Sequence, residues 1–209
     1  MNLEQVLPGE IEKRSFEIIT EELGPRVLEP EYEAVIKRVI HTTADFDYAD
    51  NLVFSDHAVN HILEALSKGT PIITDTNMGK AGINKKALSK AGSRVYCFMA
   101  DEDVAEAAKN MGTTRAAASM DKAAALEAEG TSFIFAIGNA PTALIRIKEL
   151  MDEGRLHPAA IIAVPVGFVN VVQAKELILS TDVPYIAARG RKGGSNVAAA
   201  IVNAILYQL

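Results

Sequence analysis

The sequence predicts an α/β fold in which one parallel β-sheet carries helices on both faces. Five short apolar runs follow one another along the chain and alternate with segments of helical periodicity. These runs cover residues 71–74, 94–98, 133–137, 161–164 and 184–187. Apolar runs of this length are typical of strands buried on both faces, and helices between them indicate βαβ units. No repeat or linker divides the 209 residues, so we expect a single domain spanning residues 1–209.

Helical segments precede and separate these runs. Residues 10–23 space their apolar side chains at a helical period, and Gly24-Pro25 ends that helix. A second helix is predicted over residues 31–40, ending near His41, and a third over 56–67, after the short apolar run 52–54. The last predicted helix, 194–209, is rich in alanine and begins after a glycine pair.

Composition and charge exclude several classes of protein. Hydrophobic residues make up 49% and charged residues 23% of the chain, as in ordinary globular proteins. Apolar stretches such as 159–166 fall short of the roughly 20 residues that a membrane span needs. The net charge of −6 argues against binding to nucleic acid or to an anionic membrane. The first residues lack a secretion-signal pattern and Cys97 is the only cysteine, so we expect a cytoplasmic protein.

The loops after the apolar runs are the candidate site, because ligands of open parallel sheets bind beyond the carboxyl ends of the strands. The loop 189–196 is the most basic of them, with Arg189, Arg191 and Lys192 before a glycine pair. Two interpretations stay open. The backbone N–H groups and these cations could hold carboxylates or phosphates, or the glycines only form a strand-to-helix turn while the basic side chains face solvent. No GxGxxG or GxxxxGK[ST] pattern occurs there, so the sequence does not indicate NAD or a phosphate loop.

Histidine is the candidate acid–base residue type. His41 stands at the end of a predicted helix, where a histidine titrating near neutrality can donate and recover a proton, although a lone histidine is more often structural. His57 and His61 are four residues apart on a predicted helix, which would put two metal ligands on one face. Neither belongs to an HExxH pattern and no third ligand is evident, so we expect an exposed helix face and no metal site.

Six strings, in this order along nearly the whole chain, resemble the precorrin-8X methylmutase family, which includes the cobalt-precorrin-8 methylmutases. The strings are Arg14-Ser15-Phe16, Val39-Ile40-His41, Gly112-Thr113-Thr114-Arg115, residues 136–144 with Gly138-Asn139-Ala140-Pro141-Thr142 at their centre, Pro165-Val166-Gly167-Phe168-Val169, and Arg189-Gly190-Arg191-Lys192-Gly193-Gly194-Ser195.

The resemblance implies a flavodoxin-like fold, a homodimer, and an isomerase of cobalamin (corrin) biosynthesis that uses no metal or organic cofactor. The implied reaction moves a methyl group from C-11 to C-12 on ring C of a tetrapyrrole, precorrin-8X or cobalt-precorrin-8, giving hydrogenobyrinate or cobyrinate. The sequence does not indicate which of the two is the natural substrate.

The resemblance also implies roles for particular residues. By position, His41 is implied to be the proton donor and acceptor. Residues of the substrate pocket are implied at Ser15, Arg38, Thr114 and Arg115, with Arg189 contributing from its glycine-rich loop. The segment 84–88 is richer in lysine than the family pattern, which leaves a contact of Lys85 with substrate open.

The composition is consistent with this chemistry. A corrinoid carries many carboxylates around a broad apolar macrocycle, so its site needs arginines and N–H donors beside aliphatic walls. The rearrangement needs only an acid that protonates the conjugated ring and then lets the proton leave. Two alternatives stay open: a corrinoid-binding or carrier protein with the same pocket and no turnover, and an α/β nucleotide-binding protein that uses the glycine-rich loop.

Overall fold

A six-stranded sheet forms the centre of the protein, and its strand order is β1-β6-β5-β4-β2-β3. The computed structural model describes residues 3–127 and 130–209. The strands are β1 (Leu52–Phe54), β2 (Ile72–Thr74), β3 (Val95–Tyr96), β4 (Ile134–Ile137), β5 (Ala160–Ala163) and β6 (Tyr185–Ala188). The last five coincide with the five predicted runs, and they pair in parallel. Numbered from β2, these five lie in the order 2-1-3-4-5, which is the flavodoxin-like order.

The edge strand β1 corrects the prediction of a purely parallel sheet. The apolar run 52–54 pairs with β6 in the antiparallel sense, with Leu52 opposite Ala188 and Phe54 opposite Ile186. This pairing joins residues more than 130 positions apart, so no local feature of the run indicates that it enters the sheet. The other five strands agree with the predicted fold class, a parallel sheet with helices on both faces.

Four of the helices lie within or across the four predicted segments. The helices are α1 (Ile11–Leu23), α2 (Pro30–Thr43), α3 (Tyr48–Asn51), α4 (Ala58–Ser67), α5 (Asn77–Gly82), α6 (Lys85–Lys90), α7 (Glu102–Met111), α8 (Arg115–Glu127), α9 (Pro141–Asp152), α10 (Val171–Leu179) and α11 (Ser195–Leu206), and a 3-10 turn, Pro8–Glu10, precedes α1. Helices α1, α4 and α11 are somewhat shorter than predicted, and α2 is longer. Gly24 ends α1 with a φ of 59°, a conformation that glycine adopts without strain. Helix α2 continues beyond the predicted end, which puts His41 in its last turn.

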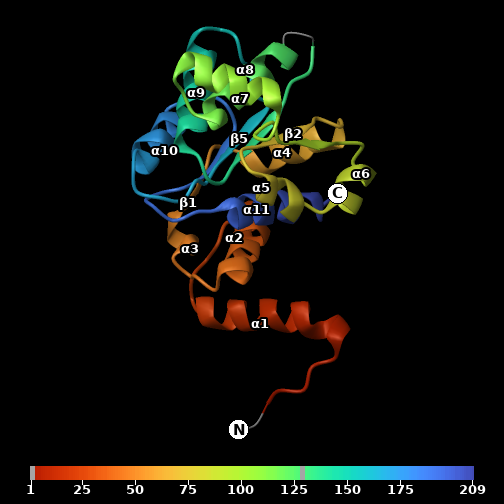
Figure 1. Cartoon of the computed structure of the whole chain (residues 1–209). Coiled ribbons are helices and arrows are strands. Elements are labelled where there is room, and N and C mark those ends of the chain that lie inside the picture. The colour runs from red at the N-terminus through yellow and green to blue at the C-terminus, as the bar shows by residue number, and fades with distance from the viewer. Residues whose placement is uncertain (1–2, 128–129) are drawn as a thin grey trace.

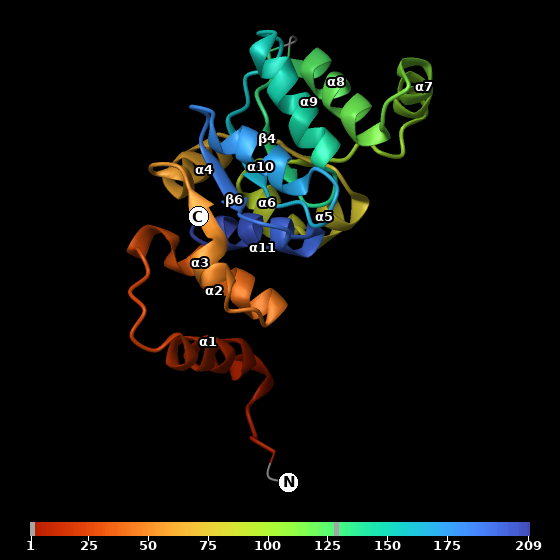
Figure 2. The ribbon, with the colours of Figure 1, turned by 90° about the vertical axis from the view of Figure 1, so that its left-hand side faces the viewer.

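The helices cover the sheet on both faces, as Figures 1 and 2 show. Helices α7, α8, α9 and α10 pack on one face, and α2, α4, α6 and α11 pack on the other. The outermost element is α1, which packs on α2 at the end of the molecule opposite α8 and α9. No helix among residues 3–127 and 130–209 is long and apolar enough to cross a bilayer.

Alternation along the strands divides the core into two layers. In β2, Ile72 belongs to the cluster under α11, and its neighbour Ile73 belongs to the cluster under α8 and α9. In β4, Ile134 and Phe135 divide in the same way. All four side chains are fully buried, because successive side chains of a strand point to opposite faces and both faces are covered.

Candidate functional site

The loops that follow β2, β4, β5 and β6 meet at the carboxyl edge of the sheet. Gly138, after β4, lies against the start of α11, where a Cβ atom would be 2.6 Å from the Cα of Ser195. Thr76, after β2, also reaches α11: its Oγ1 is 2.7 Å from Oγ of Ser195. The sequence strings that were far apart in the chain are therefore in contact at one edge.

Asp75 fixes the turn between β2 and β4, where the strand order reverses. Its side chain is buried, and its two carboxylate oxygens accept hydrogen bonds from the backbone N–H groups of Gly138 (2.9 Å), Asn139 (2.8 Å) and Ala140 (2.6 Å). Burial raises the pKa of Asp75, and the three N–H donors oppose that shift. In related folds such N–H groups at a switch point bind anionic ligands, but here Asp75 occupies them. The arrangement disfavours the nucleotide-binding alternative.

The glycine pair of the basic loop has a packing role. A Cβ atom on Gly193 would lie 2.1 Å from the carbonyl oxygen of Val164, so the close approach of the two loops requires glycine there. The N–H of Gly194 donates to that same carbonyl at 2.9 Å. At Gly194 the structure therefore supports the turn interpretation over the one in which its N–H group binds an anion.

The cations of the basic loop divide into two kinds. Lys192 donates hydrogen bonds to Asp45 and Asp47, both at 2.6 Å, across about 145 residues of sequence. These contacts raise the pKa of Lys192, and the hydrogen bond from Lys192 lowers the pKa of Asp45. Arg189 and Arg191 are exposed, and neither forms an ion pair with any residue that the structure describes. The two arginines are available to an anionic ligand, whereas Lys192 joins the loop to the turn after α2.

His41 lies beside that turn, on the last turn of α2. The helix ends at Ala44, whose φ of 53° is left-handed, and Asp45 follows directly. The imidazole of His41 is exposed and stacks on the ring of Phe16 in α1, with centroids 5.3 Å apart and planes inclined by 8°. Asp45, which pairs with Lys192 of the basic loop, is only four residues after His41, so the chain links His41 to that loop. Phe16 of α1 holds the imidazole ring.

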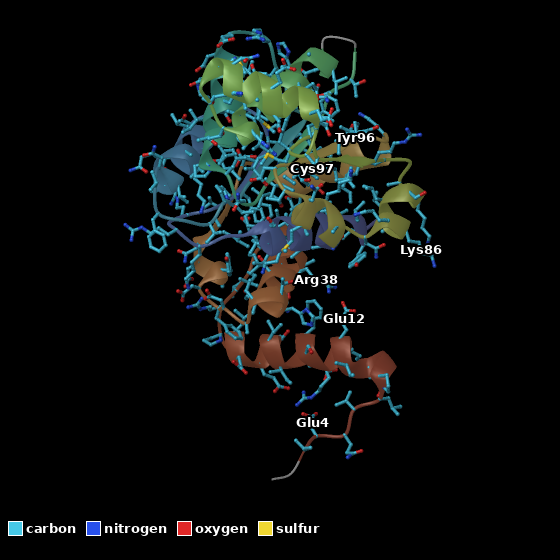
Figure 3. The ribbon with its side chains drawn as sticks, viewed as in Figure 1. Glu4, Glu12, Arg38, Lys86, Tyr96 and Cys97 are labelled. Carbon is cyan, nitrogen blue, oxygen red and sulfur yellow. The ribbon has the colours of Figure 1, made fainter. Side chains whose placement is uncertain are left out.

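Arg38 and Ser15 lie at the α1–α2 contact and bond within the chain. Arg38 pairs with Glu12 at 2.5 Å, and its guanidinium lies over the rings of Phe16 and Tyr207, at 4.8 and 5.3 Å from the centroids. Figure 3 places Arg38 and Glu12 between the two helices. Oγ of Ser15 donates to the carbonyl of Ile11, one helical turn before it.

Thr114 and Arg115 begin α8 on the other side of the edge. Oγ1 of Thr114 accepts from the N–H of Ala117 and lies 2.8 Å from Oγ1 of Thr142, at the start of α9. Arg115 is exposed and has no ion-pair partner in the described part of the chain. Thr142 directly follows the loop after β4, whose N–H groups Asp75 binds, so this pair is connected to the rest of the edge.

The structure places the candidate residues in two groups. Ser15, Arg38 and His41 lie on α1 and α2, and Thr114 and Arg115 lie at the start of α8. Arg38 of the first group lies over Tyr207, at the end of α11 that is farther from the carboxyl edge. No hydrogen bond or ion pair between described residues joins the groups directly. They are linked through the loops that Asp75, Thr76 and Lys192 connect, so a ligand reaching both groups would have to be broad.

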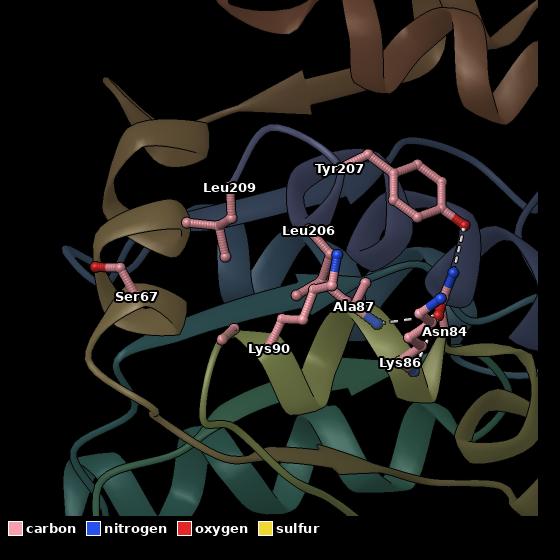
Figure 4. Close-up of a pocket in the computed structure, with 9 residues that line it drawn as sticks. Ser67, Asn84, Lys86, Ala87, Lys90, Leu206, Tyr207 and Leu209 are labelled. Carbon is pink, nitrogen blue, oxygen red and sulfur yellow. Dashed lines mark hydrogen bonds between the residues drawn. The ribbon is translucent and has the colours of Figure 1, made fainter.

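A separate cavity lies at the amino edge of the sheet (Figure 4). Its volume is about 620 Å³. Its lining residues are Ser67, Asn84, Lys86, Ala87, Lys90, Ala91, Leu206, Tyr207 and Leu209. Close by, Nζ of Lys85 donates to the carbonyls of Lys80 and Ile83 at the end of α5, so Lys85 acts as a helix cap. A role of Lys85 at the carboxyl edge finds no support in these contacts.

His57 and His61 do not share a helix face. His57 precedes α4 and has a left-handed φ of 54°, so the i, i+4 geometry predicted for the pair is absent. Nδ1 of His57 is 3.3 Å from a carboxylate oxygen of Glu31. Among the described residues no group of three or more His, Cys, Asp or Glu side chains could hold a metal ion.

Two buried charged residues at the edge were missed by the sequence analysis, Asp75 and Lys175. Lys175 lies in α10 on the stripe formed by Val171, Ala174 and Ile178, which follows the i, i+3, i+4, i+7 spacing of a buried helix face. A lysine on such a stripe indicates a buried ammonium with backbone partners, and this feature could have identified it. Asp75 directly follows an apolar run, and this position also indicates a buried charged residue, although less clearly than the position of Lys175 does.

Comparison with known proteins agrees with the geometry. Residues 10–208 match the family model described as precorrin-8X methylmutase. The chain is 46% identical to the cobalt-precorrin-8 methylmutase of Salmonella typhimurium, over 97% of this chain and 96% of that protein. It is 38% identical to the precorrin-8X methylmutase of Pseudomonas aeruginosa, over 93% of each. The crystal structure of precorrin-8X methylmutase from Thermus thermophilus superposes with a TM-score of 0.83 at 36% identity, covering 95% of this chain and 96% of that one.

The family match covers nearly the whole chain, and three of the segments that suggested the resemblance, those around Gly138, Pro165 and Arg189, meet at the carboxyl edge. The chain belongs to the precorrin-8X methylmutase family, and it is a methylmutase, an isomerase, of cobalamin biosynthesis.

Proposed function

We propose that the protein moves a methyl group from C-11 to C-12 on ring C of cobalt-precorrin-8 or precorrin-8X, giving cobyrinate or hydrogenobyrinate, with His41 as proton donor and acceptor. The observation that carries the proposal is the carboxyl edge itself. Three exposed arginines there, Arg115, Arg189 and Arg191, have no ion-pair partner among the described residues, and the exposed His41 stands four residues before Asp45, which pairs with Lys192 of the basic loop.

The binding half of the proposal depends on the arginines and on apolar groups between them. Guanidinium groups bind carboxylates through charge-assisted hydrogen bonds, and a tetrapyrrole at this stage presents carboxylates on several sides. Exposed apolar side chains at the same edge, Met78, Val166, Phe168 and Val169, suit the faces of the macrocycle. Ser15, Arg38 and Thr114 are proposed to complete the pocket from the two flanking groups.

The chemical half depends on His41. Substrate and product are isomers, so a proton added to the conjugated ring to start the methyl migration must leave again when it ends. An exposed imidazole can both donate and recover that proton, and its stack on Phe16 keeps the ring in one orientation. The proposal needs no cofactor, and the macrocycle, held on several sides, presents a single neighbouring carbon to the migrating methyl group.

The cobalt-containing substrate is the expected one. Five relatives at 39–46% identity are named for cobalt-precorrin-8, whereas two named for precorrin-8X are 38% and 35% identical, beside one cobalt-precorrin-8 relative at 36%. Anaerobic incubation with each substrate, followed by the visible spectrum of the product, tests this. Conversion supports the proposal, whereas tight binding without conversion supports the carrier alternative, and failure to bind either compound contradicts both.

We also propose that the chain forms a homodimer in the cytoplasm. The N-terminal segment leaves Leu3, Leu7 and Ile11 exposed, and such apolar side chains on an outlying helix suit contact with a second copy. The buried free thiol of Cys97 is compatible with a reducing compartment. Light scattering at micromolar concentration should give twice the chain mass of 22.4 kDa, and a fully active monomer would contradict the dimer.

A further inference from the structure

Lys175 is a buried lysine whose side chain lies between α10 and the basic loop. The residue is 1% exposed, and no carboxylate of the described residues pairs with it. Burial lowers its pKa to about 8. A buried ammonium without a counter-ion is costly unless other polar groups replace water around it, so its hydrogen-bond partners indicate what it holds in place.

Those partners are two carbonyls of the basic loop. Nζ donates to the carbonyl of Gly190 at 2.9 Å and to the carbonyl of Lys192 at 2.8 Å. The two acceptors flank Arg191, so both neighbouring peptide groups are turned toward the protein interior.

The rest of the loop is attached through its own backbone. The N–H of Arg189 donates to Asn51 at 2.8 Å, and the carbonyl of Arg191 accepts from the N–H of Gly167 at 3.2 Å. The side chain of Arg191, in contrast, extends over the exposed ring of Phe168, with its guanidinium carbon 5.3 Å from the centroid. The loop thus has its backbone polar groups inside and its arginine side chains outside.

We propose that Lys175 is a positioning residue for ligand binding: its buried ammonium holds the carbonyls on both sides of Arg191 so that Arg189 and Arg191 face the carboxylates of the bound tetrapyrrole. The proposal deepens the proposed function and rests on it for the nature of the ligand. Lys175 itself does not touch the ligand, so its effect must pass through the two arginines.

The first arm of the test needs no corrinoid. Lys175→Met keeps the length and apolar stem of the side chain but removes the donor, and Lys109→Met, on the exposed face of α7, is the control for loss of one positive charge. Trypsin cleaves after Arg and Lys, and mass spectrometry identifies which bond is cut. We expect cleavage after Arg189, Arg191 or Lys192 to become about 10-fold faster in K175M, as a loosened loop opens more often, while cleavage after Lys13 stays unchanged.

The second arm measures the affinity of the folded variants for cobyrinate. We expect K175M to weaken binding about 10-fold, as loss of a charge-assisted contact does, and K109M to leave it unchanged. Arg191→Ala and Arg115→Ala are then combined with K175M. Since Lys175 acts through Arg189 and Arg191, the combined effect of K175M and R191A should be smaller than the product of their separate effects, whereas the effects of K175M and R115A should multiply.

Each outcome decides the proposal. Unchanged trypsin cleavage of the loop in folded K175M would overturn it, and so would faster cleavage with unchanged cobyrinate affinity, or effects of K175M and R191A that multiply. If wild-type protein binds no corrinoid, the proposed function fails, and the trypsin arm still decides whether Lys175 orders the loop. If K175M does not fold, Lys175→Gln, which keeps two N–H donors on a shorter side chain, is taken through both arms with the same criteria.

Discussion

The carboxyl and amino edges of the sheet both present basic side chains, but they hold them differently. At the carboxyl edge, Arg189 and Arg191 project from a loop whose carbonyls are bound by Lys175 and whose glycines pack on a neighbouring strand end. At the amino edge, Lys86 and Lys90 stand on the short helix α6 and line a cavity of about 620 Å³.

The difference teaches that cavity size alone does not locate this site. The amino edge holds this cavity, but none of its lining residues is a histidine or an arginine. The carboxyl edge combines an exposed imidazole with arginines on rigidly held turns, and binding sites gain affinity when their groups are held in place before the ligand arrives. We therefore expect substitutions at the two edges to differ in effect by orders of magnitude.

The largest effect is expected for His41→Ala. Removing the acid should lower turnover by about 10²–10⁴-fold, the usual contribution of general acid–base catalysis, while the carboxylate contacts keep the affinity for cobyrinate within about threefold. His61→Ala, which removes an exposed histidine of α4, is the matched control. Near-normal turnover by folded H41A would mean that the proton comes from another group.

A smaller effect, on binding, is expected for Arg115→Ala. Loss of a charge-assisted contact typically costs ~1.5–3 kcal/mol, or about one to two decades in affinity. Titration with cobyrinate measures it, and wild-type binding should weaken as salt increases. Arg155→Ala removes an arginine that pairs with Glu153 away from the site and should leave affinity unchanged. Equal affinities for R115A and wild type would remove Arg115 from the pocket.

A third effect is expected at the stack that orients His41. Phe16→Leu keeps an apolar contact but removes the aromatic face, and such a ring pair contributes about 0.5–1.5 kcal/mol. Turnover should fall about 2–10-fold with little change in product affinity. The control is Phe54→Leu, which removes a stack on Tyr32 in which His41 takes no part. If both variants lose the same activity, the stack on His41 has no special role.

The smallest effect is expected at the amino edge. Lys86→Met and Lys90→Met, separately and together, should change turnover and cobyrinate affinity less than twofold, because surface charges away from a site contribute little at physiological salt. Steady-state kinetics at 0.15 M ionic strength tests this. A loss comparable to that of R115A would move the site to the opposite edge of the sheet.

Much of the fold could be predicted from local sequence features. Buried parallel strands are short and apolar, so each strand from β2 to β6 appears in the sequence as a recognisable apolar run. Strand β1 left a run of the same kind, but its antiparallel partner lies more than 130 residues away, and nothing within residues 52–54 indicates that pairing. Tertiary contacts rather than local preference place it in the sheet.

The sequence predicted where the candidate site lies, but not which of its polar groups are already paired within the protein. The carboxyl-edge rule for open sheets directed attention to the right loops. It could not indicate that Lys192 pairs with Asp45 and Asp47, because that contact depends on how α2 approaches β6. Nor could it indicate that the backbone N–H of Gly194 is bonded to Val164, because that contact depends on the close approach of the loops after β5 and β6.

The most direct test of the account is a crystal structure of the protein with cobyrinate bound. The account predicts the macrocycle at the carboxyl edge, with its carboxylates on Arg115, Arg189 or Arg191 and ring C within about 3.5 Å of the imidazole of His41, the reach of a proton transfer. A macrocycle bound at the amino edge against Lys86 and Lys90, or at the carboxyl edge with ring C turned away from His41, would contradict it.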